Sequence, residues 1–128
     1  MILITGGACQ GKRAFANERF PGLVWADGRE CEEADLFRCS GIHYFHAYIR
    51  RAMEAGKQEE ELEELAGRLI LRNPEAVVVT DEVGCGIVPL DPFERDWREQ
   101  TGRVCTRLAA ASRKVYRVIL GIGKEIKG

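Results

Sequence analysis

The chain has 128 residues, of which 45% are hydrophobic, 30% charged and 8% aromatic, and this composition excludes a disordered tail, a collagen and a coiled coil. Nineteen basic and twenty acidic residues give a formal net charge of −1, so the protein lacks the positive field that a nucleic-acid backbone requires. We therefore expect one globular domain over residues 1–128 and no nucleic-acid partner.

The spacing of the cysteines and the length of the apolar runs indicate the cellular compartment in which we expect the protein. Five cysteines, with no Cys-x-x-Cys pair, argue against a disulfide framework or a zinc ribbon and favour a reducing cytoplasm. No apolar run approaches the twenty residues of a membrane span. We expect a cytoplasmic protein with no membrane partner.

Strands are predicted where Val and Ile gather between Gly, Pro, Asn or charged residues, at 2–5, 23–26, 76–80 and 115–120. Their continuous apolarity is typical of a parallel sheet covered on both faces. A fifth short strand is predicted at 36–37.

Helices are predicted between these strands, at 13–20 and 94–111 and in two further segments. One begins at a Ser40 cap, repeats apolar residues at helical spacing and stops at Gly56, which places His43 away from the apolar stripe and His46 at its edge. The other follows the acidic residues 59–61 and ends before Pro74. The alternation favours a doubly wound α/β fold.

The strongest chemical signal lies between the first strand and the first helix. Residues 6–12 read Gly-Gly-Ala-Cys-Gln-Gly-Lys, which fits the phosphate-loop pattern G-x-x-x-x-G-K in its strand-to-helix setting. Such a loop aims backbone N–H groups and a helix dipole at the phosphates of a nucleotide, and its lysine reaches the outer ones. The predicted nucleotide-binding residues are Gly6, Gly7, Ala8, Cys9, Gln10, Gly11, Lys12 and Arg13.

Arg13 departs from the pattern, because a Ser or Thr that ligates Mg²⁺ normally follows the lysine. Four interpretations stay open. Other groups hold the metal, Arg13 itself binds phosphate oxygens, the metal-dependent step has been lost, or Arg13 is a solvated residue of the first helical turn.

Two acidic residues, Asp81 and Glu82, follow the apolar strand predicted at 76–80. The carboxyl end of such a strand is where open α/β sheets bind their ligands. We expect Asp81 to hold Mg²⁺, and Glu82 to orient a nucleophile or accept its proton, with Lys12 as the second catalytic residue. The alternative for Glu82 is an exposed acid in a turn.

Three stretches resemble the adenosylcobinamide kinase/adenosylcobinamide-phosphate guanylyltransferase family. They read Ile-Leu-Ile-Thr-Gly-Gly-Ala at 2–8, Val-Thr-Asp-Glu-Val-Gly-Cys-Gly-Ile-Val-Pro at 79–89, and Arg-Asp-Trp-Arg-Glu-Gln-Thr-Gly-Arg-Val at 95–104, the last followed by Leu-Ala-Ala-Ala at 108–111. The resemblance implies a RecA-like P-loop fold and a cytoplasmic homo-oligomer. It also implies that ATP or GTP serves to phosphorylate a cobinamide hydroxyl, after which GMP is transferred from GTP. Arg95, Arg98 and Arg103 match a basic helix of the family, expected near phosphates or at a subunit boundary.

The sequence also departs from this family. The family's guanylyl-carrying histidine follows the second strand, whereas residues 27–35 contain no histidine, which indicates a deletion there. His43 and His46 lie beyond that segment, and neither inherits the nucleophile role cleanly. Two functions follow as hypotheses: a nucleotide-dependent kinase that acts on a corrinoid, or a catalytically silent relative that binds a nucleotide or corrinoid for regulation or assembly.

Overall fold

The computed structural model describes residues 1–83 and 89–128. In this part of the chain one six-stranded sheet has the order β2-β3-β4-β1-β5-β6. All neighbouring strands are parallel except β6, which pairs antiparallel with β5. The strands are β1 (Ile2–Gly6), β2 (Trp25–Asp27), β3 (Gly41–His43), β4 (Val77–Asp81), β5 (Lys114–Ile119) and β6 (Ile122–Lys127). The predicted doubly wound α/β fold with a parallel sheet is confirmed, except that the unpredicted edge strand β6 is antiparallel.

The four main strand predictions are confirmed to within two residues, and the fifth is wrong. Residues 36–37 lie in a helix, and β3 and β6 were not predicted. The sequence does not predict β6 because nearly all of its side chains are exposed, so burial imposes no hydrophobic pattern on them. A tight turn at Leu120 and Gly121, whose φ values are 51° and 77°, reverses the chain from β5 into β6.

Five helices occupy the described residues: α1 (Lys12–Arg19), α2 (Glu33–Arg38), α3 (Phe45–Glu54), α4 (Glu59–Arg72) and α5 (Pro92–Ala111). The helix predicted to begin at Ser40 begins at Phe45 instead. Ser40 caps no helix, because its Oγ accepts a hydrogen bond from the backbone N–H of Val24 at 2.7 Å. The next residues form β3, and Tyr44, with φ 55°, turns the chain from strand to helix.

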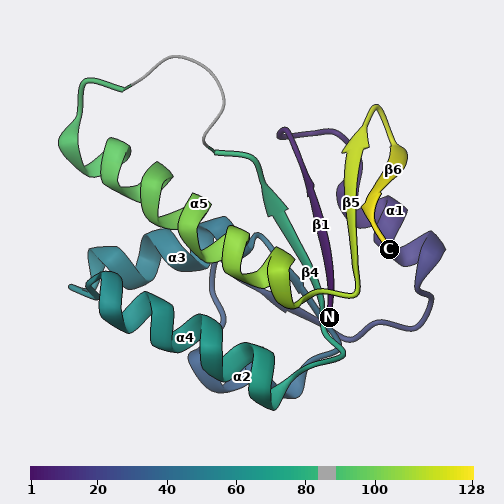
Figure 1. Ribbon diagram of the computed structural model, residues 1–128, viewed down its shortest axis with the longest axis horizontal. Helices are drawn as coiled ribbons and strands as arrows, with labels where there is room; N and C mark the ends of the chain where they lie inside the picture. The colour runs from purple at the N-terminus through teal and green to yellow at the C-terminus, as the bar shows by residue number, and fades with distance from the viewer. Residues whose placement is uncertain (84–88) are drawn as a thin grey trace.

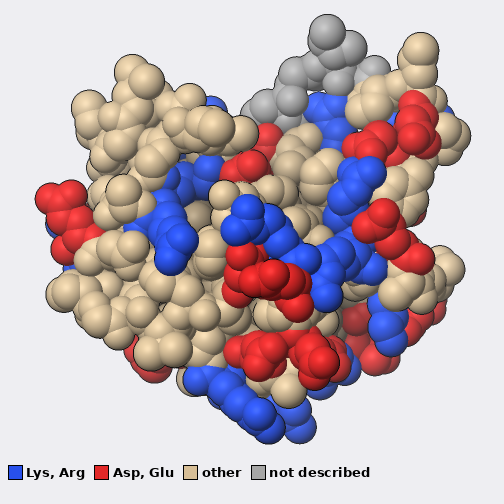
Figure 2. Space-filling model, turned by 180° about the vertical axis from the view of Figure 1, so that it is seen from behind, with Lys and Arg blue, Asp and Glu red and all other residues tan. Residues whose placement is uncertain are grey.

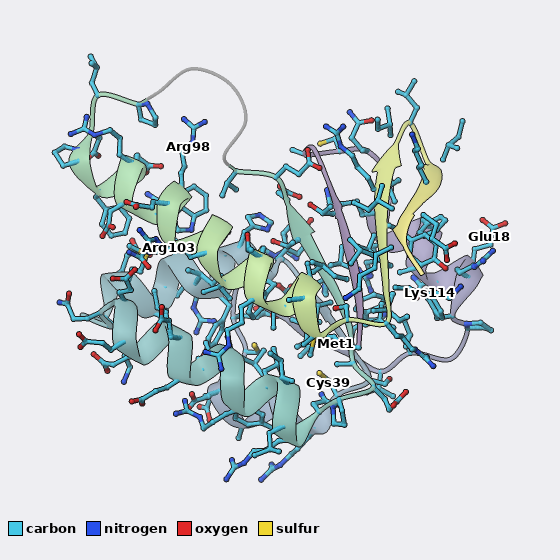
Figure 3. All side chains as sticks on the ribbon, in the orientation of Figure 1. Met1, Glu18, Cys39, Arg98, Arg103 and Lys114 are labelled. Carbon is cyan, nitrogen blue, oxygen red and sulfur yellow. The ribbon has the colours of Figure 1, made fainter. Side chains whose placement is uncertain are left out.

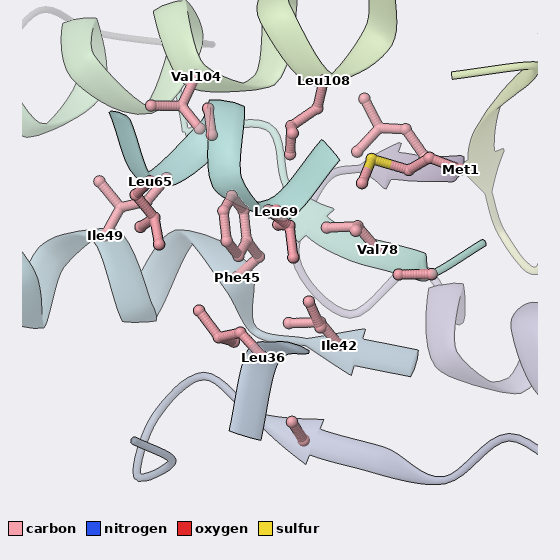
Figure 4. Close-up of a cluster of buried hydrophobic side chains, with 14 of the residues drawn as sticks. Met1, Leu36, Ile42, Phe45, Ile49, Leu65, Leu69, Val78, Val104 and Leu108 are labelled. Carbon is pink, nitrogen blue, oxygen red and sulfur yellow. The ribbon is translucent and has the colours of Figure 1, made fainter. Parts of the chain in front are cut away.

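Helices cover both faces of the sheet, as the apolar strands require (Figure 1). On one face, α1 packs over Ile2, Ile4, Val79 and Val118. On the other, α2 to α5 enclose the larger core shown in Figure 4, whose labelled side chains are Met1, Leu36, Ile42, Phe45, Ile49, Leu65, Leu69, Val78, Val104 and Leu108. Burial of this core stabilises the framework on which the loops at the sheet edge are mounted.

The register of the central strands brings two predicted site elements together. β1 and β4 are parallel neighbours, and Gly6 at the end of β1 pairs with Asp81 at the end of β4. Parallel strands end at the same edge of a sheet, so the glycine loop and the acidic residues share that edge.

The surface is mixed in charge. Figure 2 shows acidic and basic side chains interspersed on one face of the molecule. Within residues 1–83 and 89–128, no helix combines the length and the apolar character that crossing a bilayer demands.

Candidate functional site

The loop between β1 and α1 is bounded by two glycines that its backbone requires. Gly11, which caps α1, has φ 82°, a left-handed conformation that glycine adopts without strain. A Cβ on Gly6 would lie 2.5 Å from the carbonyl oxygen of Val118 in β5. A larger residue at Gly6 would therefore push the loop away from the sheet.

The turn between β5 and β6 supports the middle of this loop. The carbonyl oxygen of Gln10 accepts a hydrogen bond from the N–H of Gly121 at 2.7 Å. Its side-chain Oε1 accepts another from the N–H of Leu120, also at 2.7 Å. The hairpin thus fixes the loop at a single residue through both its main chain and its side chain.

Lys12 stands at the start of α1, and its side chain is only 8% exposed. Its Nζ donates to the carbonyl oxygen of Gly7 at 2.7 Å and lies 2.7 Å from Oδ1 of Asp81. The ammonium is therefore held inside the loop, between a backbone carbonyl and the carboxylate of β4.

His46, on α3, holds the same carboxylate from the other side. Its Nδ1 accepts the backbone N–H of Asp81 at 3.0 Å, and its Nε2 lies 3.2 Å from Oδ2 of Asp81. Burial is the main cause that lowers the pKa of His46; Lys12 lowers it further, and Asp81 opposes both. The ring is therefore neutral at pH 7, and because Nδ1 accepts, we assign its one proton to Nε2, which donates to Asp81.

A cleft of about 260 Å³ opens above this cluster. The loop, the first turn of α1, the end of β3 with the residue after it, and β4 line this cleft: Ala8, Cys9, Gln10, Gly11, Lys12, Arg13, Ala14, His43, Tyr44, Val79, Thr80 and Asp81. Of the predicted site residues, the structure gathers Ala8 to Arg13 and Asp81 around one space. Gly6, Gly7 and Glu82 are not among the lining residues.

Glu82 is neither exposed nor directed into the cleft. Its carboxylate forms a two-pronged ion pair with Arg117 of β5, at 2.9 and 3.1 Å, and its side chain is 19% exposed. Its backbone N–H donates to the carbonyl oxygen of Gly6 at 2.9 Å. Glu82 thus ties the end of β4 to β1 and to β5, beside the cleft.

Arg13 is exposed on the first turn of α1. Its guanidinium lies 5.6 Å from the ring centroid of Trp25, a cation–π distance. The Trp25 indole in turn donates to Asn17 at 2.9 Å. Arg13 therefore lines the cleft from a surface position, where it can reach an anion and supplies no metal ligand.

His43 differs from its prediction. It lies on β3 and is 5% exposed, rather than pointing outward from a helix, because the strand pairs on both sides and buries its residues. Its Nε2 is 3.9 Å from Oδ2 of Asp27, and burial lowers its pKa. The Arg29 guanidinium is the main cause that lowers the pKa of Asp27 to about 2.

The residues present fit a magnesium ion only in part. Asp81 supplies a carboxylate in the cleft, and Mg²⁺ in phosphate sites commonly takes one or two carboxylates plus phosphate oxygens and water. Among the described residues, no group of three or more His, Cys, Asp or Glu side chains could hold a metal ion. Asp81 would thus hold Mg²⁺ together with the phosphates of a bound nucleotide.

Two arginines of α5, Arg95 and Arg103, make structural contacts. Arg103, labelled in Figure 3, pairs with Glu59 of α4 and with Glu99 of its own helix, both at 2.9 Å. Arg95 donates to the carbonyl oxygens of Pro89 and Leu90. These two residues brace α5, and neither lines the cleft.

The fold and the cleft together define an α/β protein of the P-loop type with a candidate nucleotide site. The profile of the family "Cobinamide kinase / cobinamide phosphate guanyltransferase", CobU, matches residues 24–126, which include Asp81 and Glu82 and begin after the glycine loop. The chain belongs to this family.

Two curated relatives are similar over part of their length. Both are named "Bifunctional adenosylcobalamin biosynthesis protein CobU", and they come from Salmonella typhimurium strain LT2 and Escherichia coli strain K12. They are 53% and 51% identical to this chain over 51 residues. These alignments cover 40% of this chain and 28% of each relative.

Proposed function

We propose that residues 1–128 act as one nucleotide-binding domain, in which the loop from Gly6 to Arg13 binds the phosphates of ATP or GTP. The observation that carries this proposal is the buried ammonium of Lys12 beneath the cleft, 2.7 Å from Asp81. An ammonium held there by a carboxylate and a carbonyl can exchange those partners for phosphate oxygens, which bear more charge. The loop amides and the amino end of α1 add further attraction for an anion.

We propose phosphoryl transfer to a hydroxyl of cobinamide as the reaction, on the strength of the family's name. The hydroxyl oxygen attacks the terminal phosphorus, the bond to the bridging oxygen breaks, and the nucleoside diphosphate leaves. Lys12 neutralises charge on the transferred group, and Asp81 would hold Mg²⁺, which would supply further positive charge to the phosphates. Glu82, which Arg117 holds at 2.9 Å beside the cleft, accepts the hydroxyl proton after its carboxylate leaves Arg117 and turns toward the substrate.

Guanylyl transfer has less support in this chain. Residues 27–35, where the resemblance places the guanylyl-carrying histidine, contain none. That segment forms a turn and the start of α2 instead. We therefore propose the kinase step without the second transfer, in a cytoplasmic homo-oligomer.

A silent binding protein is the second candidate, and Arg13 favours it. The hydroxyl that would ligate Mg²⁺ is replaced by a guanidinium, which cannot bind a cation. Such a protein would bind a nucleotide or a corrinoid for regulation or assembly.

Turnover of ATP and GTP with adenosylcobinamide and Mg²⁺ tests the proposal. We expect phosphorylated product from the wild type and a loss of at least a hundredfold in Lys12→Met, since electrostatic stabilisation by one such group is worth about 10²–10³ in rate. Lys57→Met is the matched control, because Lys57 is 56% exposed and paired with Glu61 away from the cleft. Absence of product at high protein concentration would rule out the kinase.

Thermal melting separates the two candidates. Stabilisation by a triphosphate that needs Mg²⁺ supports the kinase, and stabilisation that is independent of Mg²⁺ supports silent binding. Arg13→Ser restores the missing hydroxyl, so metal-dependent hydrolysis gained by this variant would also favour silent binding in the wild type.

A further inference from the structure

We infer that His46 is a positioning residue, which holds the Asp81 carboxylate in place when Lys12 leaves it for the phosphates of a nucleotide. This role rests on the proposed function, because Lys12 has no reason to move unless the loop binds a nucleotide. Neither the sequence pattern nor the family resemblance gives His46 a role.

The two carboxylate oxygens of Asp81 have different partners. Oδ1 lies 2.7 Å from Nζ of Lys12, whereas Oδ2 lies 3.2 Å from Nε2 of His46. The second ring nitrogen, Nδ1, accepts the backbone N–H of Asp81 at 3.0 Å. One imidazole therefore holds both the side chain and the main chain of Asp81, independently of Lys12.

The position of the ring is itself fixed. The His46 side chain is 12% exposed. The indole Nε1 of Trp97, on α5, donates to the backbone carbonyl of His46 at 3.0 Å, which anchors this turn of α3. The imidazole has little freedom to turn away from Asp81.

Nucleotide binding needs such a support. When Lys12 exchanges Asp81 for phosphate oxygens, a carboxylate that is 23% exposed loses its cation next to an incoming anion. The Nε2–H of His46 keeps Oδ2 hydrogen-bonded through this exchange, and it leaves Oδ1 directed away from the imidazole. This hydrogen bond strengthens once Asp81 has lost its cation, and His46 thereby lowers the free energy needed to separate Lys12 from Asp81.

Calorimetric titration with a non-hydrolysable ATP analogue, without metal, tests this role in a double-mutant cycle. We expect His46→Leu to weaken binding about tenfold, as loss of a hydrogen bond to a charged group does. His46→Gln, whose amide can both accept and donate, should stay within about threefold of the wild type. In an Asp81→Ala background, His46→Leu should have a much smaller effect, since the carboxylate is gone and only the contact with the backbone N–H of residue 81 remains.

The test has a control variant on the same helix, and its contrary outcomes separate the role of His46 from the proposed function. Tyr48→Phe, on the same helix but lining a different cavity with Glu33 and Lys57, should bind like the wild type. Unchanged affinity in His46→Leu, or an equal loss with Asp81→Ala, would overturn the role of His46 alone. A wild type that binds no triphosphate would overturn the proposed function, and this role with it.

A spectrum of the wild type guards against variants that fail to fold. Long-range ¹H–¹⁵N correlation of the histidine rings should show His46 as the Nε2–H tautomer. An Nδ1–H tautomer would contradict the contact with the Asp81 backbone and overturn the inference.

Discussion

The partners of the Lys12–Asp81 ion pair should differ in how much stability their removal costs. Asp81→Asn leaves an ammonium that is 8% exposed, whereas Lys12→Met leaves a carboxylate that is 23% exposed and still bonded to His46. Removing one partner of a buried pair costs about 3–5 kcal/mol. Partial exposure reduces this to about 3 kcal/mol for Asp81→Asn and about 2 kcal/mol for Lys12→Met. The double variant should lose about 2 kcal/mol less stability than the sum of the two single losses, because it leaves neither charge without its partner.

Urea unfolding followed by circular dichroism measures these free energies, with the slope against urea unchanged among the variants. The control cycle uses the exposed pair Lys57 and Glu61, at 3.3 Å, where we expect coupling below about 0.5 kcal/mol. Additive losses at Lys12 and Asp81, or a larger loss for Lys12→Met than for Asp81→Asn, would refute the burial argument.

Three further predictions concern the loop and its surroundings. Gly6→Ala should abolish nucleotide binding, because the new Cβ would lie 2.5 Å from a β5 carbonyl oxygen; unchanged titration heat would contradict this. The pKa of Asp27 is lowered from 3.8 to about 2 in the folded protein, so ionised Asp27 stabilises the fold at pH values above 3.8. The free energy of unfolding should therefore fall as the pH drops from 3.8 to about 2, and Asp27→Asn should flatten this decline. Burial raises the pKa of Cys105 to about 11, so a maleimide should label the exposed Cys9 before Cys105, with mass spectrometry as the readout; faster labelling of Cys105 than of Cys9 would argue against this reasoning.

Local patterns in the sequence were enough to predict the glycine loop and the strands and helix around it. The strand before Gly6, the helix after Gly11 and the apolar strand before Asp81 each carry their signal within a few residues. The meeting of Lys12 and Asp81 then follows from the rule that parallel strands end at one edge. The structure confirms the sheet type, while the binding roles of these residues stay predictions.

The region from Asp27 to Tyr44 could not be read in the same way. Ile42, Phe45 and Ile49 have helical spacing by coincidence, because Ile42 belongs to a strand and the others to α3. The three-residue β3 exists through pairing with β2 and β4, and Gly41 fits it because a Cβ would lie 2.8 Å from the Trp25 ring. Such pairing depends on distant residues, so no local propensity reports it.

His46 and Arg117 were missed for a related reason. Each contacts a residue 35 positions away, at Asp81 and Glu82 respectively. Neither has a motif, since a lone histidine on a helix and a lone arginine on an edge-proximal strand are common. Their roles become visible only when the strands are placed side by side.

Calorimetric titration of ATP and GTP into the wild type and Lys12→Met tests most directly whether the cleft is a nucleotide site. We predict one site on the wild type for at least one of the two nucleotides, and an affinity at least about tenfold weaker in Lys12→Met, as expected for losing a charge-assisted contact to phosphate. No heat with either nucleotide, or equal affinity in the variant, would contradict the assignment of the loop as a phosphate-binding site.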